Sequence, residues 1–366
     1  MSNKLKHKIS QLFICKTPDS FEEIEKFILE GIGGFMIGKG GEIATSDEGK
    51  IEGDSEKSLK KFVSIIKKLS KKNNELSLFL AIDGEGGKYF NRFKNFSEYK
   101  SPRFYGKKFE RDYDLKYFVC EVEKYARLMK QIGINMNFAP LIDVSIKGYK
   151  GYIAEEKILV RKDLLVKSEI LSSNRSYSDN KKTVNTLAIA SMKVFQDNDI
   201  IPTLKHFLTY GILKKSENPH FVMPIIDLNK KELNEHIDNY RKAFLKGAYA
   251  IMSGHIMTVF DKNMPVSLSK KTYKFIRNEL RFKGLIITDE LNMGSIRRFY
   301  NGSHVEIAAI DAVYANDMIL ISRPKTFLKM RDAIYEVALK NKKMREVISD
   351  RYKRIIRYKK KIGIIN

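Results

Sequence analysis

The sequence predicts an α/β fold in which strands and helices alternate and close into a single (β/α)8 TIM barrel. Short apolar runs alternate along the chain with amphipathic segments of helical period. The runs are apolar at consecutive positions, as expected for strands of a parallel sheet that is buried on both faces. Polar residues stand at the ends of most runs, and a barrel brings these ends together at one mouth. In a doubly wound open sheet, which is the alternative, they would be spread along an edge.

Seven apolar runs are predicted to be strands. They cover residues 33–38, 76–83, 134–144, 201–207, 248–255, 284–290 and 318–322. An eighth strand is expected near 175–177, where the apolar pattern is weak. Amphipathic segments predict helices at 56–72, 112–132, 180–196, 230–246, 270–281, 304–315, 324–340 and 342–361. Strands and helices that alternate in this way indicate βαβ units.

One barrel domain is expected to occupy residues 1–366, because α/β barrels often exceed roughly 250 residues. The segment 145–174 interrupts the alternation, so the barrel can be irregular there. This segment follows the third of the visible strands, is rich in Lys, Glu and Ser, and is long for a βα loop. We expect it to be an insertion over the mouth.

The chain carries a formal net charge of +24. Such an excess is typical of nucleic-acid-binding proteins. Here, however, lysines are spread over nearly every predicted helix, acidic residues lie between them, and no nucleic-acid-binding motif is found. Solvated helix faces explain this pattern better. We therefore expect no nucleic-acid partner, and the sequence does not decide the oligomeric state.

The location in the cell is expected to be the cytoplasm. No run of 18 apolar residues is found, so no membrane span is predicted. The first 20 residues lack the apolar core and the cleavage site of a secretory signal. The two cysteines, Cys15 and Cys120, are far apart in the sequence and suggest plain thiols in a reducing compartment.

Several strand ends carry side chains that can do chemistry. Asp289 ends the run 284–290, where a carboxylate enters the mouth as a nucleophile or electrostatic stabiliser, unless it only caps the following helix. Lys205 and His206 end another run and can bind sugar hydroxyls, although a histidine on an apolar strand is often a hydrogen-bonded core residue. Asp83 in AIDGEGG can accept two hydroxyl groups. This glycine-rich stretch lacks the spacing of phosphate-binding loops.

A polar loop at 210–224 carries His220, which titrates near neutral pH if it is exposed. An ordinary surface histidine would fit the same pattern. The spacings HxH, HExxH and CxxC are absent, so no metal site is expected.

Taken in order, several segments resemble the bacterial β-N-acetylhexosaminidases of glycoside hydrolase family 3. DGEGGKYFNRF is similar to the family's DQEGGRVxRF, INMNFAPLIDV to NFAPVLDV, and NRSYSD to NRSFGxD. TLKHF is similar to AKHFPGHG, AIMSGHI to AVMTAHV, and RFKGLIITDELNMGSI to GFDGVVISDDLEMGAI. The closing ANDMILIS is similar to GADLLLL. The resemblance covers residues 10–325, roughly, and the order and spacing of the motifs make it specific.

The resemblance implies a retaining glycosidase that removes terminal β-linked N-acetylglucosamine from peptidoglycan-type fragments. Asp289 matches the nucleophile, and His220 matches a general acid/base carried on a mobile loop. The matching sugar-binding or pocket-lining positions are Asp83, Arg92, Arg175, Lys205, His206, His255 and Met293. No metal or organic cofactor is implied. The substrate class follows from length, because the larger β-glucosidases of the family usually carry a second domain.

Two departures from the family pattern bear on activity. The aspartate that partners the catalytic histidine is Asn218 here, which can orient an imidazole but cannot stabilise its cation by charge. Glu217 could take over this role in a differently folded loop. The family's PGHG is LTYG here and lacks a histidine. Two hypotheses therefore stand, an active glycosidase with a remodelled loop and a weakly active or inactive sugar-binding barrel that serves as sensor or scaffold.

Overall fold

The protein was studied as a computed structural model, which describes residues 2–37, 42–46, 49–52, 56–73, 76–87, 99–145, 175–302 and 305–366. Two of the predicted features lie outside the described residues. They are Arg92 and all but the first residue of the expected insertion at 145–174. The prediction of a single domain over the whole chain, with that insertion, stays a prediction.

Eight parallel strands form a ring, and the predicted barrel is confirmed. The strands are β1 (Phe13–Lys16), β2 (Gly34–Met36), β5 (Phe79–Ile82), β6 (Met136–Asn137), β7 (Ile201–Phe207), β8 (Ala250–Ser253), β9 (Leu285–Thr288) and β10 (Ile319–Ile321). Their order is β10-β1-β2-β5-β6-β7-β8-β9. A parallel bridge between Ile287 and Met318 joins the two ends of this sheet. The strands are almost wholly buried, which explains their continuous apolar runs.

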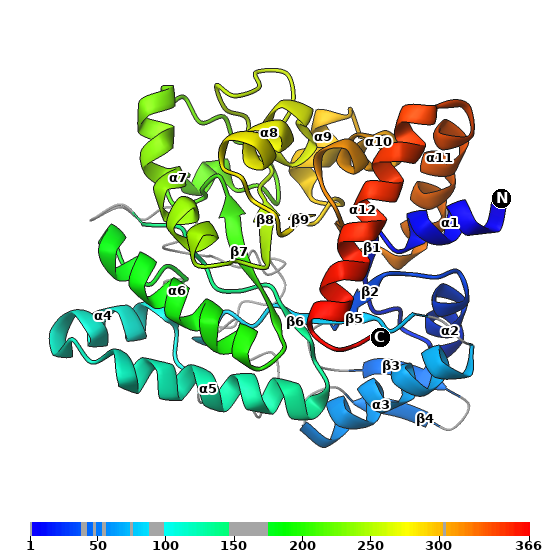
Figure 1. The fold of residues 1–366 in the computed structure, drawn as a ribbon, viewed down its shortest axis with the longest axis horizontal. Coiled ribbons are helices and arrows are strands. Elements are labelled where there is room, and N and C mark those ends of the chain that lie inside the picture. Colours follow the sequence, from blue (N-terminus) through cyan, green and yellow to red (C-terminus); the bar gives the residue numbers. More distant parts are fainter. Residues whose placement is uncertain are drawn as a thin grey trace, which may run out of the picture.

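Helices surround the ring (Figure 1). They are α1 (Ser2–Ser10), α2 (Phe21–Leu29), α3 (Glu56–Lys72), α4 (Pro102–Asp112), α5 (Leu115–Ile132), α6 (Lys181–Asp197), α7 (Lys230–Leu245), α8 (Lys270–Lys274), α9 (Gly294–Phe299), α10 (Val305–Ala315), α11 (Phe327–Lys340) and α12 (Lys342–Lys361). The antiparallel hairpin of β3 (Glu42–Ser46) and β4 (Gly49–Glu52) lies between β2 and α3 in the chain. No helix in the described part of the chain combines the length and hydropathy needed to cross a membrane.

The position predicted for the eighth strand was wrong. Residues 175–177 form no strand, with bends at 176 and 177, and the missing strand is β1, near the amino terminus. β1 has only four residues and ends in a lysine, so its apolar pattern is too short to stand out in the sequence. Because β1 comes first, the segment 145–174 follows the fourth barrel strand, β6, and not the third.

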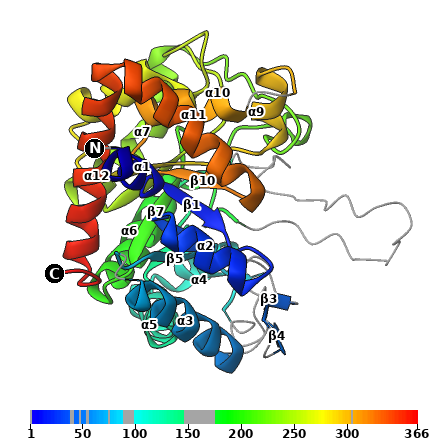
Figure 2. The same cartoon turned by 90° about the vertical axis from the view of Figure 1, so that its right-hand side faces the viewer.

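Helix α12 lies across the amino ends of several strands. Lys359 donates to Gln11, which precedes β1, with 2.8 Å between Nζ and Oε1. Arg357 donates to the carbonyl of Lys283, ahead of β9, over 2.6 Å. Figure 2 shows α12 on one side of the molecule, while α9 and the β3–β4 hairpin lie on the other. The last helix therefore closes the end of the barrel opposite the mouth.

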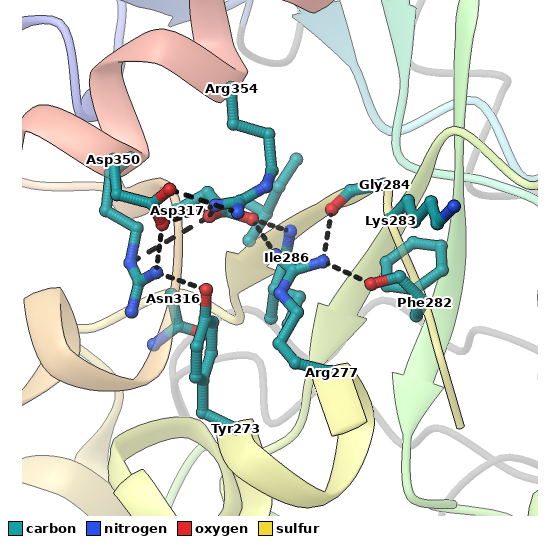
Figure 3. Close-up of polar contacts among 12 residues, drawn as sticks. Tyr273, Arg277, Phe282, Lys283, Gly284, Ile286, Asn316, Asp317, Asp350 and Arg354 are labelled. Atoms are coloured by element: carbon teal, nitrogen blue, oxygen red, sulfur yellow. Dashed lines mark hydrogen bonds and ion pairs between the residues drawn. The ribbon is translucent and has the colours of Figure 1, made fainter. Parts of the chain in front are cut away.

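A buried carboxylate, Asp317, links α12 to the amino ends of β9 and β10 (Figure 3). Its oxygens accept hydrogen bonds from the Ile286 amide at 2.7 Å, from Arg354 at 2.6 Å and from Arg277. Burial alone would raise the pKa of Asp317, but the arginines around it outweigh this effect and the pKa is lowered. At this end of a barrel, charged residues serve stability.

We expect Asp317→Asn to lower the free energy of unfolding by about 3–5 kcal/mol, because three arginines would lose their buried counter-charge. A denaturant titration measures this loss. The pKa of Asp317 is lower in the folded than in the unfolded chain, so its contribution is present above the unfolded pKa and lost as the pH falls. The difference in the free energy of unfolding between wild type and Asp317→Asn should therefore become smaller at low pH. Asp350→Asn, on a half-exposed partner of Arg354, should cost far less, and equal losses would contradict this account.

Candidate active site

The candidate residues within the described part of the chain all lie on the carboxyl side of the strands, opposite α12. Asp83 directly follows β5, and Lys205 and His206 lie in β7 just before its last residue, Phe207. His255 and Asp289 follow β8 and β9. The remaining four lie in connections at the same end of the barrel, and they are Arg175, Asn218, His220 and Met293. The ring therefore brings side chains from four strand ends, and from the connections between them, to one mouth.

A buried ion cluster joins Arg175 and Lys205 to two carboxylates. Arg175 donates to both oxygens of Glu85, each over 2.7 Å. Lys205 Nζ lies 2.6 Å from Glu85 Oε1 and 2.5 Å from Asp83 Oδ1. Burial alone would raise the pKa of Glu85, but Arg175 and Lys205 hold it far below its ordinary value. Two cations and two anions thus neutralise one another.

Glu85 is a central member of this cluster that sequence reasoning missed. Its partner Arg175 is 90 residues away, so no local pattern links them. The side chains of Glu85, Arg175 and Lys205 are at most 6% exposed, whereas that of Asp83 is 22% exposed. Asp83 is therefore the member of the cluster that a ligand in the mouth can reach most directly.

Asp143 lies in the segment that follows β6, and it orients residues at and after the end of β7. Its Oδ2 lies 3.0 Å from His206 Nδ1 and accepts the His206 amide over 2.9 Å. Its Oδ1 accepts the amide of Tyr210 over 3.2 Å. The rings of His206 and Tyr210 stack with 4.2 Å between their centroids. One carboxylate thus orients an imidazole and a phenol together.

Asp289 receives hydrogen bonds on both carboxylate oxygens. The hydroxyl of Tyr210 donates to Oδ2 over 2.9 Å, and the amide of Glu290 donates to Oδ1 over 2.8 Å. Burial alone would raise the pKa of Asp289, but the nearby imidazole of His206 and the Glu290 amide help to lower it to about 2. Asp289 is therefore an ionised, oriented carboxylate. Sequence reasoning had noted Tyr210 only as a lost histidine.

His255 supports the site from behind. Its amide donates to the hydroxyl of Tyr210 over 2.7 Å. Its Nε2 lies 2.8 Å from the carbonyl oxygen of Glu290, and its Nδ1 lies 2.7 Å from the hydroxyl of Ser267. Burial lowers the pKa of His255, so a neutral ring that donates from Nε2 and accepts at Nδ1 fits these partners. Both ring nitrogens are thus engaged by the protein.

The loop that carries His220 is held against the start of α9. The amide of Gly294 donates to the carbonyl of His220 over 3.0 Å, and Ser295 donates to the carbonyl of Pro219 over 3.2 Å. Asn218 Oδ1 accepts the amide of His220 over 2.9 Å, so this side chain shapes the turn. Glu217 instead accepts the amide of Lys214 over 2.7 Å.

Met293 is buried directly before α9 and lines a cavity beside His220. Among the described residues, no group of three or more His, Cys, Asp or Glu side chains is arranged to hold a metal ion.

Two curated relatives match the greater part of this chain. Beta-hexosaminidase A of Pseudoalteromonas piscicida is 25% identical over 258 residues, 65% of this chain and 39% of that protein. A beta-hexosaminidase of Nitrosomonas eutropha is 25% identical over 251 residues, 67% of this chain and 64% of its own. The chain thus spans less than two thirds of the length of these curated relatives.

Solved structures share the fold. A glycoside hydrolase family 3 beta-N-acetylglucosaminidase from Paenibacillus superposes with a TM-score of 0.78 at 22% identity, over 98% of this chain and 63% of that one. A beta-N-acetylhexosaminidase from Beutenbergia cavernae gives 0.79 at 18% identity, over 97% and 98% of the two chains. At sequence level, the model of the glycosyl hydrolase family 3 N terminal domain matches residues 167–358, more than half of the 366 residues. The chain therefore belongs to glycoside hydrolase family 3.

Proposed function

We propose that this protein is a β-N-acetylhexosaminidase that removes terminal β-linked N-acetylglucosamine, with Asp289 as the nucleophile. The observation that carries the proposal is the environment of Asp289. Its carboxylate is held by Tyr210 and by the Glu290 amide, and its pKa is lowered to about 2. Such a group is ionised and oriented at neutral pH, as a nucleophile must be. The names of the relatives and structural neighbours support the substrate class.

The reaction would retain the configuration of the sugar. Asp289 would attack the anomeric carbon, the bond to the leaving group would break, and the leaving oxygen would take a proton from a general acid. Water would then hydrolyse the glycosyl-enzyme with the same group acting as base. Asp289 would be regenerated as a carboxylate, so the cycle needs no cofactor.

His220 is the proposed general acid/base. Its loop packs on the start of α9, which follows closely after Asp289 in the chain. The charge of His220 also helps to lower the pKa of Asp289, which places the two groups in one electrostatic environment. Asn218 would set the backbone of His220 through the amide hydrogen bond described above.

Binding of the sugar is assigned to the cluster around Lys205. Asp83 would accept hydroxyl groups, since its carboxylate is the most exposed of the four. Arg175 and Lys205 lower the pKa of Glu85 and so keep this carboxylate ionised, and His206 would present the ring edge that faces away from Asp143. Arg92, which the family resemblance implies as a further sugar ligand, lies outside the described residues.

We further propose peptidoglycan-type fragments as substrates and the cytoplasm as the location. Both cysteines are free thiols, one buried and one exposed, which suits a reducing compartment. The alternative function, a sugar-binding barrel with little hydrolysis, is favoured by one observation. Asn218 offers no negative charge to stabilise a protonated His220.

Asp289→Ala should lower the turnover of an aryl N-acetylglucosaminide by a factor on the order of 10⁴ or more, because the covalent step loses its nucleophile. A steady-state assay measures this, with circular dichroism to show an intact fold. A mechanism-based fluoro-sugar should label Asp289 in the wild type. Retained turnover or a label on another residue would remove the assignment. An aryl glucoside in parallel tests the requirement for the N-acetyl group.

On a substrate whose leaving group is a sugar, Asn218→Asp should raise kcat by about tenfold or more, because an aspartate can stabilise the imidazolium of His220. In the serine protease triad the converse change costs about 10⁴ in kcat. Asn229→Asp is a matched control, since Asn229 also uses its Oδ1 to accept backbone amides, at the start of α7. An unchanged or lower rate in Asn218→Asp would show that His220 is not the acid/base.

Tyr210→Phe should lower kcat roughly 10- to 100-fold with little change in KM, because a hydrogen bond to a charged oxygen is lost. Loss of this donor destabilises the carboxylate and raises the pKa of Asp289. The acid limb of the kcat/KM profile should therefore move to higher pH. Tyr210→His, which restores the family residue, should recover part of the rate.

Tyr240→Phe is the control for this experiment, because the buried Tyr240 hydroxyl has no hydrogen-bond partner among the described residues. Both variants remove one buried phenol oxygen. If they changed the pH profile equally, the role given to Tyr210 would be refuted.

A further inference from the structure

A cavity of about 820 Å³ opens beside the loop that carries His220. It lies between this loop, α9 and the turn that follows β10. Its principal lining residues are His220, Glu290, Met293, Arg297, Arg298 and Arg323. Asp289 and the cluster around Lys205 are not among the lining residues, so the cavity adjoins the candidate nucleophile without containing it.

The arginines of this cavity differ from most others in the protein. Four described arginines have a guanidinium without a hydrogen bond, ion pair or ring contact to another described residue. Three of them, Arg297, Arg298 and Arg323, line this one cavity. The fourth, Arg281, is exposed elsewhere. Cationic groups that have no partner among the described residues therefore gather at this cavity.

The described residues bring little compensating negative charge to the cavity. Glu290 is the one acidic residue among those that line it, and Glu290 Oε1 accepts the amides of Asn292 and Ser322 over 2.6 and 3.1 Å. Burial raises the pKa of Glu290 to about 7, so this carboxyl is only partly ionised near neutral pH. The positive charge of the three arginines is left available to a ligand.

The position of His220 relates the cavity to the proposed reaction. A general acid must touch the oxygen of the leaving group, so the leaving group extends past the acid on the side away from the nucleophile. His220 forms part of the wall of this cavity, and its carbonyl is held by Gly294 of the same wall. A leaving group that receives its proton from His220 would enter here.

We propose that this cavity is the leaving-group subsite and that Arg297, Arg298 and Arg323 select a leaving group that carries a carboxylate. The inference rests on the proposed function and adds to it the chemistry of the aglycone. Guanidinium groups pair with carboxylates through two parallel hydrogen bonds, which supplies both attraction and orientation. Because the three side chains are exposed, ionic screening weakens the attraction.

The test compares two aryl N-acetylglucosaminides, one with a neutral aglycone and one with a carboxylate on the aryl ring. We expect the wild type to favour the carboxylate in kcat/KM by roughly tenfold at low salt, and less at high salt. The triple variant Arg297→Gln, Arg298→Gln, Arg323→Gln should lose this preference. Because the preference is the ratio of two kcat/KM values measured with one protein, a general loss of activity in the variant cancels from it. Arg281→Gln removes an equally unpaired arginine outside the cavity and should keep the preference.

A preference that survives in the triple variant, or that is also lost in Arg281→Gln, would overturn the subsite. Failure of the proposed function has a different signature, because the wild type would then turn over neither substrate. In that case calorimetric titration of the same two glycosides still tests the cavity. Tighter binding of the carboxylate form that disappears in the triple variant would support the subsite, and equal affinities would refute it.

Discussion

A buried carboxylate must have its charge compensated, and several segments of this barrel provide this compensation for Asp289. An ionised oxygen without partners in a protein interior would take up a proton and lose its nucleophilic character. Here Tyr210 and the Glu290 amide donate to its two oxygens. Tyr210 is in turn fixed by Asp143 and by the amide of His255. The arrangement therefore joins three strand ends, those of β6, β8 and β9, through the segment after β7.

Charged side chains at the two ends of the barrel differ in how completely they are buried and paired. At the amino end, Asp317 is wholly buried and its oxygens are taken by a backbone amide and by arginines from two helices. Such saturation leaves nothing for a ligand and suits a structural role. At the mouth, Asp83 keeps part of its side chain exposed, and the guanidinium of Arg297 lines a cavity with no hydrogen-bond or ion-pair partner among the described residues. Exposed charges of this kind are accessible to a polar ligand, whereas the buried carboxylate of Asp317 is not.

Sequence alone predicted the barrel, because most strands are buried on both faces and are continuously apolar. It missed β1, whose run FICK is short and close to the amino terminus. The strand-end positions of Asp289, Lys205 and Asp83 were visible for the same reason as the strands. The partners of these residues could not be predicted from the sequence. Glu85 pairs with Arg175, which is 90 residues away in the chain, and Tyr210 pairs with Asp289, which is 79 residues away. Such pairings depend on ring closure, which no local pattern encodes.

The departures from the family pattern affect the two halves of the proposed reaction unequally. Tyr210 replaces a histidine but still offers a hydrogen-bond donor to Asp289, so the nucleophilic half keeps its geometry. Asn218 keeps the backbone of His220 in place yet removes a charge, so the acid/base half is weakened. Aryl leaving groups are good enough to depart with little help from an acid, whereas sugar alkoxides need the proton. Aryl substrates therefore bypass His220 only as the acid of the first step and still need it as the base that activates water, whereas a natural glycoside exposes what Asn218 costs in both steps.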